Sequence, residues 1–140
     1  ENDNVYLLCK SPAHLTHFAH YRVDKIADIQ VDTETIPPLD TDMDPYRYTA
    51  QRKFMYSDAL YTITLRCHYR MLYDLIDQFG SALSLVPADE THFIAYLRAS
   101  RQGIVYLALQ YARYCEIVQP ADLRQEIISI LQDTLKRYER

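Results

Sequence analysis

The alternation of apolar and polar residues near the start of the chain predicts a β-hairpin. Residues 5–10 (VYLLCK) favour a strand, and the Ser-Pro pair after them marks a turn. From Thr16 the residues alternate with a period of two, which predicts a second strand that could continue to Val31. Because two strands are not stable alone in water, we expect the hairpin to pack on other strands of this chain, of another chain, or upstream of this sequence. The two faces of the second strand would carry His17, Ala19, Tyr21 and Val23, and Phe18, His20, Arg22 and Asp24.

The next segment has the composition of a linker. Residues 33–44 (TETIPPLDTDMD) are acidic and contain two adjacent prolines. Asp44 can cap a short helix over about residues 45–53, with Pro45 at its first position. We therefore expect a linker with one short helix between two structured parts.

After residue 58 the patterns follow the order strand, helix, strand, strand, helix, strand, helix. This β-α-β-β-α-β order predicts an α+β fold with a ferredoxin-like sheet and an extra C-terminal helix. Gly80 can end the first helix, and Ser100 can cap the second. The helices would cover one face of the sheet, so we expect a partner subunit or the N-terminal hairpin on the other face. The predicted strands are 61–68, 83–87, 92–98 and 114–118, and the predicted helices are 69–79, 101–112 and 120–138.

The last predicted helix carries an apolar stripe along one side. Such a stripe fits a buried core, and it also fits part of a dimer interface. Aromatic residues of the preceding helix could belong to the same interface. The stripe consists of Leu123, Ile127, Ile130, Leu131 and Leu135, and the aromatic residues are Tyr106 and Tyr111.

Composition and charge narrow the classes of function. The 140 residues carry a formal net charge of −4, whereas binding to double-helical DNA requires a concentrated basic surface. Only 2 glycines occur, which argues against glycine-rich phosphate loops, and 13 tyrosines suit half-buried sheets and interfaces. Three widely spaced cysteines without a CxxC motif indicate reduced thiols in a cytoplasmic protein. No apolar run is long enough to span a membrane.

Three histidines at intervals of three raise the possibility of a metal site. His14, His17 and His20, together with Cys9, would be enough ligands for zinc. On a strand, however, position 17 points away from positions 14 and 20, and no second closely spaced pair of ligands supports a site. A structural or catalytic metal is therefore the weaker alternative to histidines that are solvated or hydrogen-bonded.

Several motifs, in their order along the chain, resemble a known family. Val5-Tyr6-Leu7, followed by HYRVDKI at 20–26, resembles the second half of a WYL domain, which carries a Trp-Tyr-Leu strand and then a Tyr-Arg-Val-Asp-Arg strand. The resemblance extends over nearly the whole chain, because later blocks are similar to the C-terminal extension that follows WYL domains in bacterial transcriptional regulators. These blocks are FMYSDALYTITLRCH at 54–68, MLYDLIDQFG at 71–80 and EIVQPADLRQEI at 116–127.

The resemblance implies the ligand-sensing and dimerising portion of such a regulator. Residues 1–32 would be the last strands of a WYL domain, which is a small Sm-like β-barrel. Residues 33–58 would be a linker with a short helix, and residues 59–140 would be the ferredoxin-like extension, which commonly forms a homodimer. DNA would be bound only through an upstream helix-turn-helix that is absent from this chain. The resemblance implies no enzymatic activity, no cofactor and no membrane contact.

The resemblance also implies which residues bind a ligand. The known ligands of the family are often a nucleic acid or a nucleotide. Arg22 would bind a phosphate in bidentate fashion and Tyr6 would stack on a base, with Lys25 and His20 beside them. These four residues are therefore the candidate ligand-binding residues.

Three departures from the family pattern keep a second function open. Many family members carry a further arginine near position 19, where this chain has Ala19. Val5 stands at the position of the family's tryptophan, and Lys25 replaces an arginine, which keeps the charge but loses the bidentate fork. A dimerisation or scaffold module without a ligand is therefore the alternative. In that case Arg22 would form an ion pair with Asp24 or across the strands.

Overall fold

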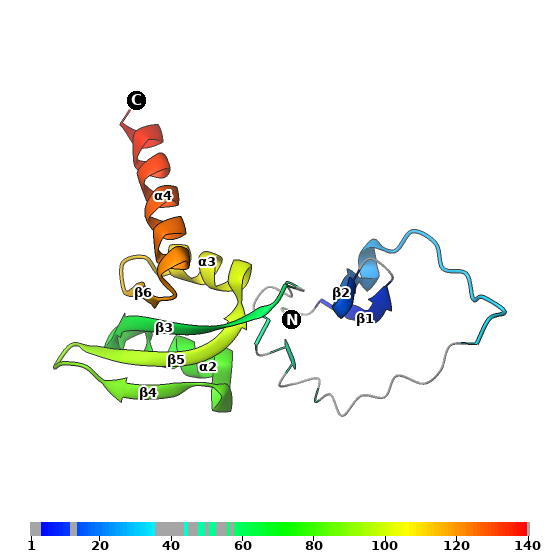
Figure 1. Ribbon diagram of the computed structural model, residues 1–140, viewed down its shortest axis with the longest axis horizontal. Coiled ribbons are helices and arrows are strands. Elements are labelled where there is room, and N and C mark those ends of the chain that lie inside the picture. Colours follow the sequence, from blue (N-terminus) through cyan, green and yellow to red (C-terminus); the bar gives the residue numbers. More distant parts are fainter. Residues whose placement is uncertain are drawn as a thin grey trace.

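The protein has an α+β fold with two separate antiparallel sheets. The computed structural model describes residues 4–11, 14–35, 44, 48, 49, 51, 52, 56 and 58–139. Within these residues one sheet has two strands and the other has four (Figure 1). The predicted fold class is therefore confirmed. Whether the two-stranded sheet belongs to an Sm-like barrel, and where the domain boundaries lie, stays a prediction.

The N-terminal sheet is the predicted hairpin. Strand β1 (Tyr6–Ser11) pairs with β2 (His14–Arg22), with Tyr6 directly opposite Arg22. Strand β2 ends at Arg22 and is followed by a single 3-10 turn (Val23–Lys25), so the expected continuation to Val31 is wrong. The last bond between the strands runs from the Val23 amide to the Val5 carbonyl at 3.0 Å, and no strand in the described part of the chain lies opposite the residues beyond it.

Most of the predicted linker lies outside the described residues. Tyr48 and Thr49 of the predicted short helix are helical, and the Tyr48 amide donates to the Asp44 carbonyl at 2.9 Å, whereas residues 51 and 52 form a turn. The Gln51 carbonyl accepts a hydrogen bond of 3.1 Å from the amide of Ser100. This bond connects the linker to the four-stranded sheet.

The C-terminal part has the strand order of a ferredoxin-like fold. Its strands lie in the order β4-β5-β3-β6, and every neighbouring pair is antiparallel. Each predicted element is present in the predicted order. The elements are β3 (Leu60–His68), α2 (Leu72–Phe79), β4 (Ser84–Pro87), β5 (His92–Ser100), α3 (Arg101–Gln110), β6 (Cys115–Gln119) and α4 (Ala121–Tyr138).

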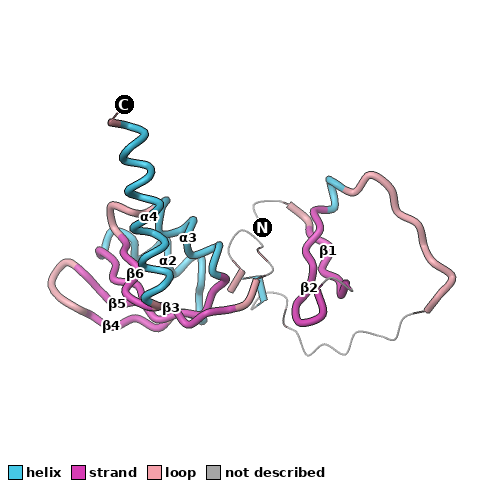
Figure 2. Tube along the Cα trace, turned by 45° about the horizontal axis from the view of Figure 1, so that its top comes forward, coloured by secondary structure: helices cyan, strands magenta, loops and turns pink. Residues whose placement is uncertain are grey.

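Helices α2 and α3 lie on the same side of this sheet and enclose the core (Figure 2). The alternation in β3 places every second residue in the core, and the same holds for β5. Burial of these apolar side chains is the main stabilising contribution to this unit. The largest fully buried side chains are Phe79, Phe93, Ile63, Leu65, Met71, Leu75, Ile104, Leu107 and Leu123.

Two predicted helix ends have the expected local chemistry. Gly80 follows α2 with a φ of 50°, a conformation that a residue with a Cβ atom adopts only with strain. The Ser100 hydroxyl accepts a hydrogen bond of 3.3 Å from the Gly103 amide and so caps α3. Ser100 is fully buried, so its hydroxyl needs this partner.

Helix α4 is anchored at its first turns and then extends away from the sheet (Figure 1). Leu123 is its one buried residue among those described. Arg101 of α3 donates to Asp122 at 2.6 Å and to Glu126 at 2.7 Å, which attaches the start of α4 to α3. Further along, Leu135 of the predicted stripe is 57% exposed. The stripe therefore packs against the core through Leu123, Ile127 and Ile130, and its remaining two residues are exposed.

The face of the sheet opposite the helices has no cover in the described part of the chain. Val86, Tyr96 and Arg98 are all exposed on this face. The prediction that the helices occupy one face is confirmed. The expected partner on the other face stays a prediction.

Candidate functional site

The hairpin brings together the residues that the sequence indicated as a ligand site. Tyr6 and Arg22 are directly opposite each other in the register, and Leu8 and His20 form the next pair on that face. Directly opposed residues of an antiparallel pair project to the same face. Tyr6, His20 and Arg22 therefore share one face of the hairpin, as the alternation predicted for the two residues of β2.

The guanidinium of Arg22 is occupied by a carboxylate of the same chain. Arg22 Nε donates to Asp24 Oδ1 at 3.0 Å, and Arg22 Nη2 donates to Asp24 Oδ2 at 2.7 Å. This bidentate bond raises the pKa of Arg22 and lowers the pKa of Asp24. Both groups are accessible to solvent, so the pair can open at little cost. An anionic ligand would have to displace Asp24 from Arg22.

Lys25 lies next to this ion pair, at the end of the 3-10 turn. Its side chain is exposed, and its charge contributes to the lowered pKa of Asp24. The phenol of Tyr6 is close enough to Arg22 to affect the pKa of the guanidinium. Two cations, one carboxylate and one aromatic ring thus lie together at this end of the hairpin.

His20 is held by a residue that the sequence did not indicate. Its Nε2 atom pairs with the hydroxyl of Tyr48 at 2.8 Å, and the two rings meet edge to face with their centroids 5.6 Å apart. Burial raises the pKa of the Tyr48 phenol. The guanidinium carbon of Arg52 lies 4.1 Å from the centroid of the Tyr48 ring, a cation–π distance. The spacing of four between Tyr48 and Arg52 in a predicted helix was the signal that could have revealed this pair.

The opposite face of the hairpin is apolar and exposed. Leu7 and Tyr21 are directly opposed and about half exposed, and Val23 follows on the same face. This is the face that would pack on further strands if the resemblance to a WYL domain holds. Among the described residues of this face, Ala19 is buried, whereas Leu7, Tyr21 and Val23 remain exposed.

Only one of the three histidine side chains of the possible metal site, that of His20, lies in the part of the chain that the structure describes. No group of three or more histidine, cysteine or acidic side chains is arranged there to hold a metal ion. All three histidine positions lie in β2, as the alternation predicted, and His20 is engaged with Tyr48. The side chains of His14 and His17 lie outside the described residues.

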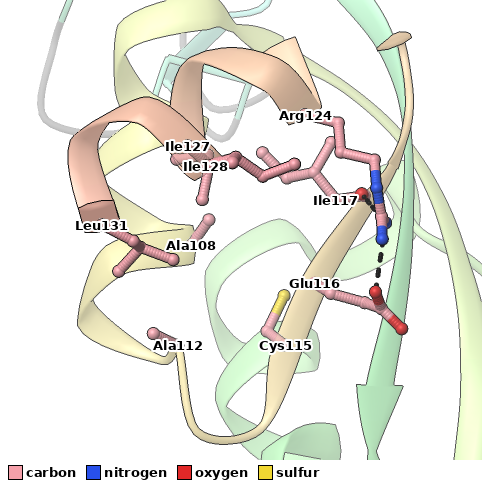
Figure 3. Close-up of a pocket in the computed structure, with 9 residues that line it drawn as sticks. All are labelled: Ala108, Ala112, Cys115, Glu116, Ile117, Arg124, Ile127, Ile128 and Leu131. Atoms are coloured by element: carbon pink, nitrogen blue, oxygen red, sulfur yellow. Dashed lines mark hydrogen bonds and ion pairs between the residues drawn. The ribbon is translucent and has the colours of Figure 1, made fainter.

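A small apolar cleft lies between α3, β6 and the first half of α4 (Figure 3). It has a volume of about 200 Å³, which is below the range of about 300–1,000 Å³ that is usual for small-molecule pockets. Arg124 borders the cleft and donates to Glu116 at 3.1 Å and to the Ile117 carbonyl at 2.7 Å. The cleft therefore suits one apolar side chain of a partner better than a whole ligand. Its apolar lining consists of Ala108, Ala112, Cys115, Ile117, Ile127, Ile128 and Leu131.

Cys115 at this cleft faces a second buried thiol. Cys67 and Cys115 are directly opposed on β3 and β6, with their sulfur atoms 3.5 Å apart, and both thiols are free. The hydrogen bond with Cys67 and the burial both raise the pKa of the Cys115 thiol. A thiol with a raised pKa forms little thiolate, and Cys67 is fully buried, so we assign both cysteines to core packing.

Comparison with known proteins assigns no family to the chain. No protein-family model matches it, and no curated protein matches it at a significant level. In the ranges that the structure describes, none of the helices has the length and apolar character needed to cross a membrane.

Proposed function

We propose that the chain is the ligand-sensing and dimerising portion of a cytoplasmic bacterial transcriptional regulator of the WYL type. In this proposal the hairpin binds a nucleotide or a single-stranded nucleic acid, and the ferredoxin-like unit forms a homodimer. Ligand binding would change the relative placement of two subunits and so bias an upstream DNA-binding domain. The protein itself would be non-enzymatic.

The observation that carries the proposal is the cross-strand pairing of Tyr6 with Arg22, next to Lys25. An arginine fork binds a phosphate in bidentate fashion, and a tyrosine ring stacks on a base. Here both groups project from the same face, and both cations are accessible to solvent. Since Asp24 holds the Arg22 fork in place, the fork is already oriented, and the ligand phosphate would take the place of the carboxylate.

Two further observations support the assembly in this proposal. The apolar face with Leu7, Tyr21 and Val23 needs cover, which further strands of an Sm-like barrel would provide. The exposed stripe on α4 and the cleft beside it are apolar surfaces of the kind found at the centre of homodimer interfaces. The dimer is thus proposed to form through α4.

A dimerisation module without a ligand is the second candidate. The observation that favours it is the occupied state of Arg22, whose fork is satisfied by Asp24. In this case the Arg22–Asp24 pair would only fix the turn after β2. The two candidates differ in ligand binding and agree on the dimer.

Titration of the protein with fluorescently labelled single-stranded oligonucleotides and with nucleotides tests the proposal. We expect saturable binding in the wild-type protein and a loss of about tenfold or more in affinity for Arg22→Ala, since a hydrogen bond to a charged group is lost. Arg98→Ala is the matched control, because Arg98 is an exposed arginine on the other sheet. Unchanged affinity in Arg22→Ala, with the fold intact by circular dichroism, would leave the module without a ligand as the better account.

A further inference from the structure

Three segments of the ferredoxin-like unit meet in a polar pocket that lies apart from the hairpin. The pocket has a volume of about 160 Å³ at one end of the four-stranded sheet. The end of β3, the start of β5 and the turn before β6 form its walls, and backbone bonds fix all three. The His68 amide donates to the Tyr114 carbonyl at 2.8 Å, and the Tyr69 amide donates to the Thr91 carbonyl at 3.0 Å.

The first pocket residue is His68, whose ring offers a hydrogen-bond donor. Its Nδ1 atom accepts a hydrogen bond of 3.1 Å from the backbone amide of Arg70. An accepting Nδ1 carries no proton, so the ring proton is on Nε2. Since His68 lines the pocket, its Nε2–H is the group that remains available to a ligand.

The second pocket residue is His92, directly opposite His68, and its ring offers the complementary acceptor. The hydroxyl of Thr91 donates to Asp89 Oδ1 at 2.8 Å, and His92 Nδ1 lies 2.7 Å from that hydroxyl and 3.2 Å from Asp89 Oδ1. Because the carboxylate only accepts and the hydroxyl proton is already used, His92 Nδ1 is the donor. In the neutral ring Nε2 then carries a lone pair. The two rings meet edge to face with centroids 5.4 Å apart.

The third pocket residue is Arg113, which supplies a positive charge without a carboxylate partner among the described residues. Its guanidinium carbon lies 5.9 Å from the centroid of the Tyr114 ring. Arg66, by contrast, is matched by Asp89 at 2.7 Å and by Glu116 at 3.7 Å. Arg66 therefore fixes the wall of the pocket, and Arg113 is the cation available to a ligand.

The charges in this pocket favour an anion. Arg66 is paired with Asp89, and Glu116 is paired with Arg124, so Arg113 is the lining charge that has no partner of opposite sign among the described residues. The bond from Arg124 to Glu116, at 3.1 Å, comes from outside the pocket and reduces the effect of this carboxylate. The whole chain carries a net charge of −4, so the local excess is opposite in sign to that of the protein.

We propose that the pocket formed by His68, His92 and Arg113 binds inorganic phosphate. Hydrogen phosphate carries both P–O⁻ oxygens and a P–OH group. The oxygens would accept from His68 Nε2–H and from Arg113, and the P–OH would donate to His92 Nε2. The pocket volume is several times the ~30 Å³ that one water occupies in the liquid, so one phosphate ion fits. Sulfate has the same shape and no proton to donate, so it would bind more weakly.

Titration of the protein with phosphate at constant ionic strength, followed through the ring nitrogens of His68 and His92 by NMR, tests the proposal. We expect saturable shifts of both rings and an affinity about tenfold lower in Arg113→Gln, because one charge-assisted hydrogen bond is lost. Arg98→Gln is the matched control, an exposed arginine on the open face of the same sheet, and it should bind phosphate as the wild type does.

Three results would overturn this inference. They are an absence of saturation by about 50 mM phosphate, an equal loss of affinity in Arg98→Gln, and an equal affinity for sulfate. Arg22→Ala should leave phosphate binding at this pocket unchanged. Failure of the hairpin site and failure of the phosphate site are therefore distinguishable.

Discussion

The single buried leucine of α4 should determine whether this helix stays attached to the ferredoxin-like unit. Leu123 is fully buried in the core, and no other residue in the described part of α4 is buried. Leu123→Ala would leave a cavity in the core and remove the one fully buried side chain in the described part of the helix, where Ile127 and Ile130 are only partly buried. Leucine-to-alanine changes at such sites cost about 3 kcal/mol or more of unfolding free energy.

A thermal or urea unfolding curve measures this cost. For a domain of this size each kcal/mol corresponds to about 4–8 °C, so the midpoint of Leu123→Ala should fall by more than about 10 °C. Leu135→Ala is the matched control on the same helix. Because Leu135 is 57% exposed and full burial of a leucine contributes about 1.5–3 kcal/mol, its loss should cost less than about 1 kcal/mol in the monomer.

The same two variants separate core packing from dimerisation. At low protein concentration only Leu123→Ala should be destabilised. At high concentration Leu135→Ala should also unfold earlier and dissociate more readily in sedimentation, if α4 forms the proposed dimer. Equal midpoints for the two variants at low concentration would refute the assignment of Leu123 as the anchor of α4.

Three shorter predictions concern the ferredoxin-like unit and the hairpin. Ser100→Ala should lower the unfolding free energy by about 1 kcal/mol in urea, since the cap of α3 is lost; no change would show that the cap does not contribute. With a thiol reagent in native buffer, Cys9, which is half-buried, should react well before the buried Cys67 and Cys115, which should react only on unfolding; rapid reaction of all three would contradict the assigned packing. Hydrogen bonds from Thr91 and Arg66 hold the pKa of Asp89 well below its usual range, so its contribution to stability is present above about pH 4 and is lost as the pH falls further. Asp89→Asn should therefore reduce the steepness of acid unfolding, and an unchanged acid limb would exclude this contribution.

The order of elements in the C-terminal part could be read from the sequence because local and long-range preferences agree there. In β3 and β5 the period of two coincides with a face that helices bury, so the alternation is strong. Gly80 and Ser100 mark helix ends through backbone conformation and hydrogen bonding, which depend on the residue alone.

Other features depend on which segments lie opposite one another, and these could not be read from single residues. The alternation suggested a strand as far as Val31, but β2 ends at Arg22 because no described strand continues beside it. The apolar stripe on α4 looks uniform in the sequence, and only packing distinguishes Leu123 from Leu135. The candidate residues on the hairpin were predicted, whereas the contact of Tyr48 with His20 joins positions that are 28 residues apart.

The central claim is that Arg22 binds a phosphate group after displacing Asp24, and a titration of two opposed variants tests it most directly. The affinity for a single-stranded oligonucleotide or nucleotide should fall about tenfold in Arg22→Ala and should rise in Asp24→Asn, because the competing carboxylate is removed while the fork remains. A ligand-free role for this ion pair predicts no binding in any of the three proteins. Affinity in Asp24→Asn that is equal to or lower than that of the wild type would contradict the account.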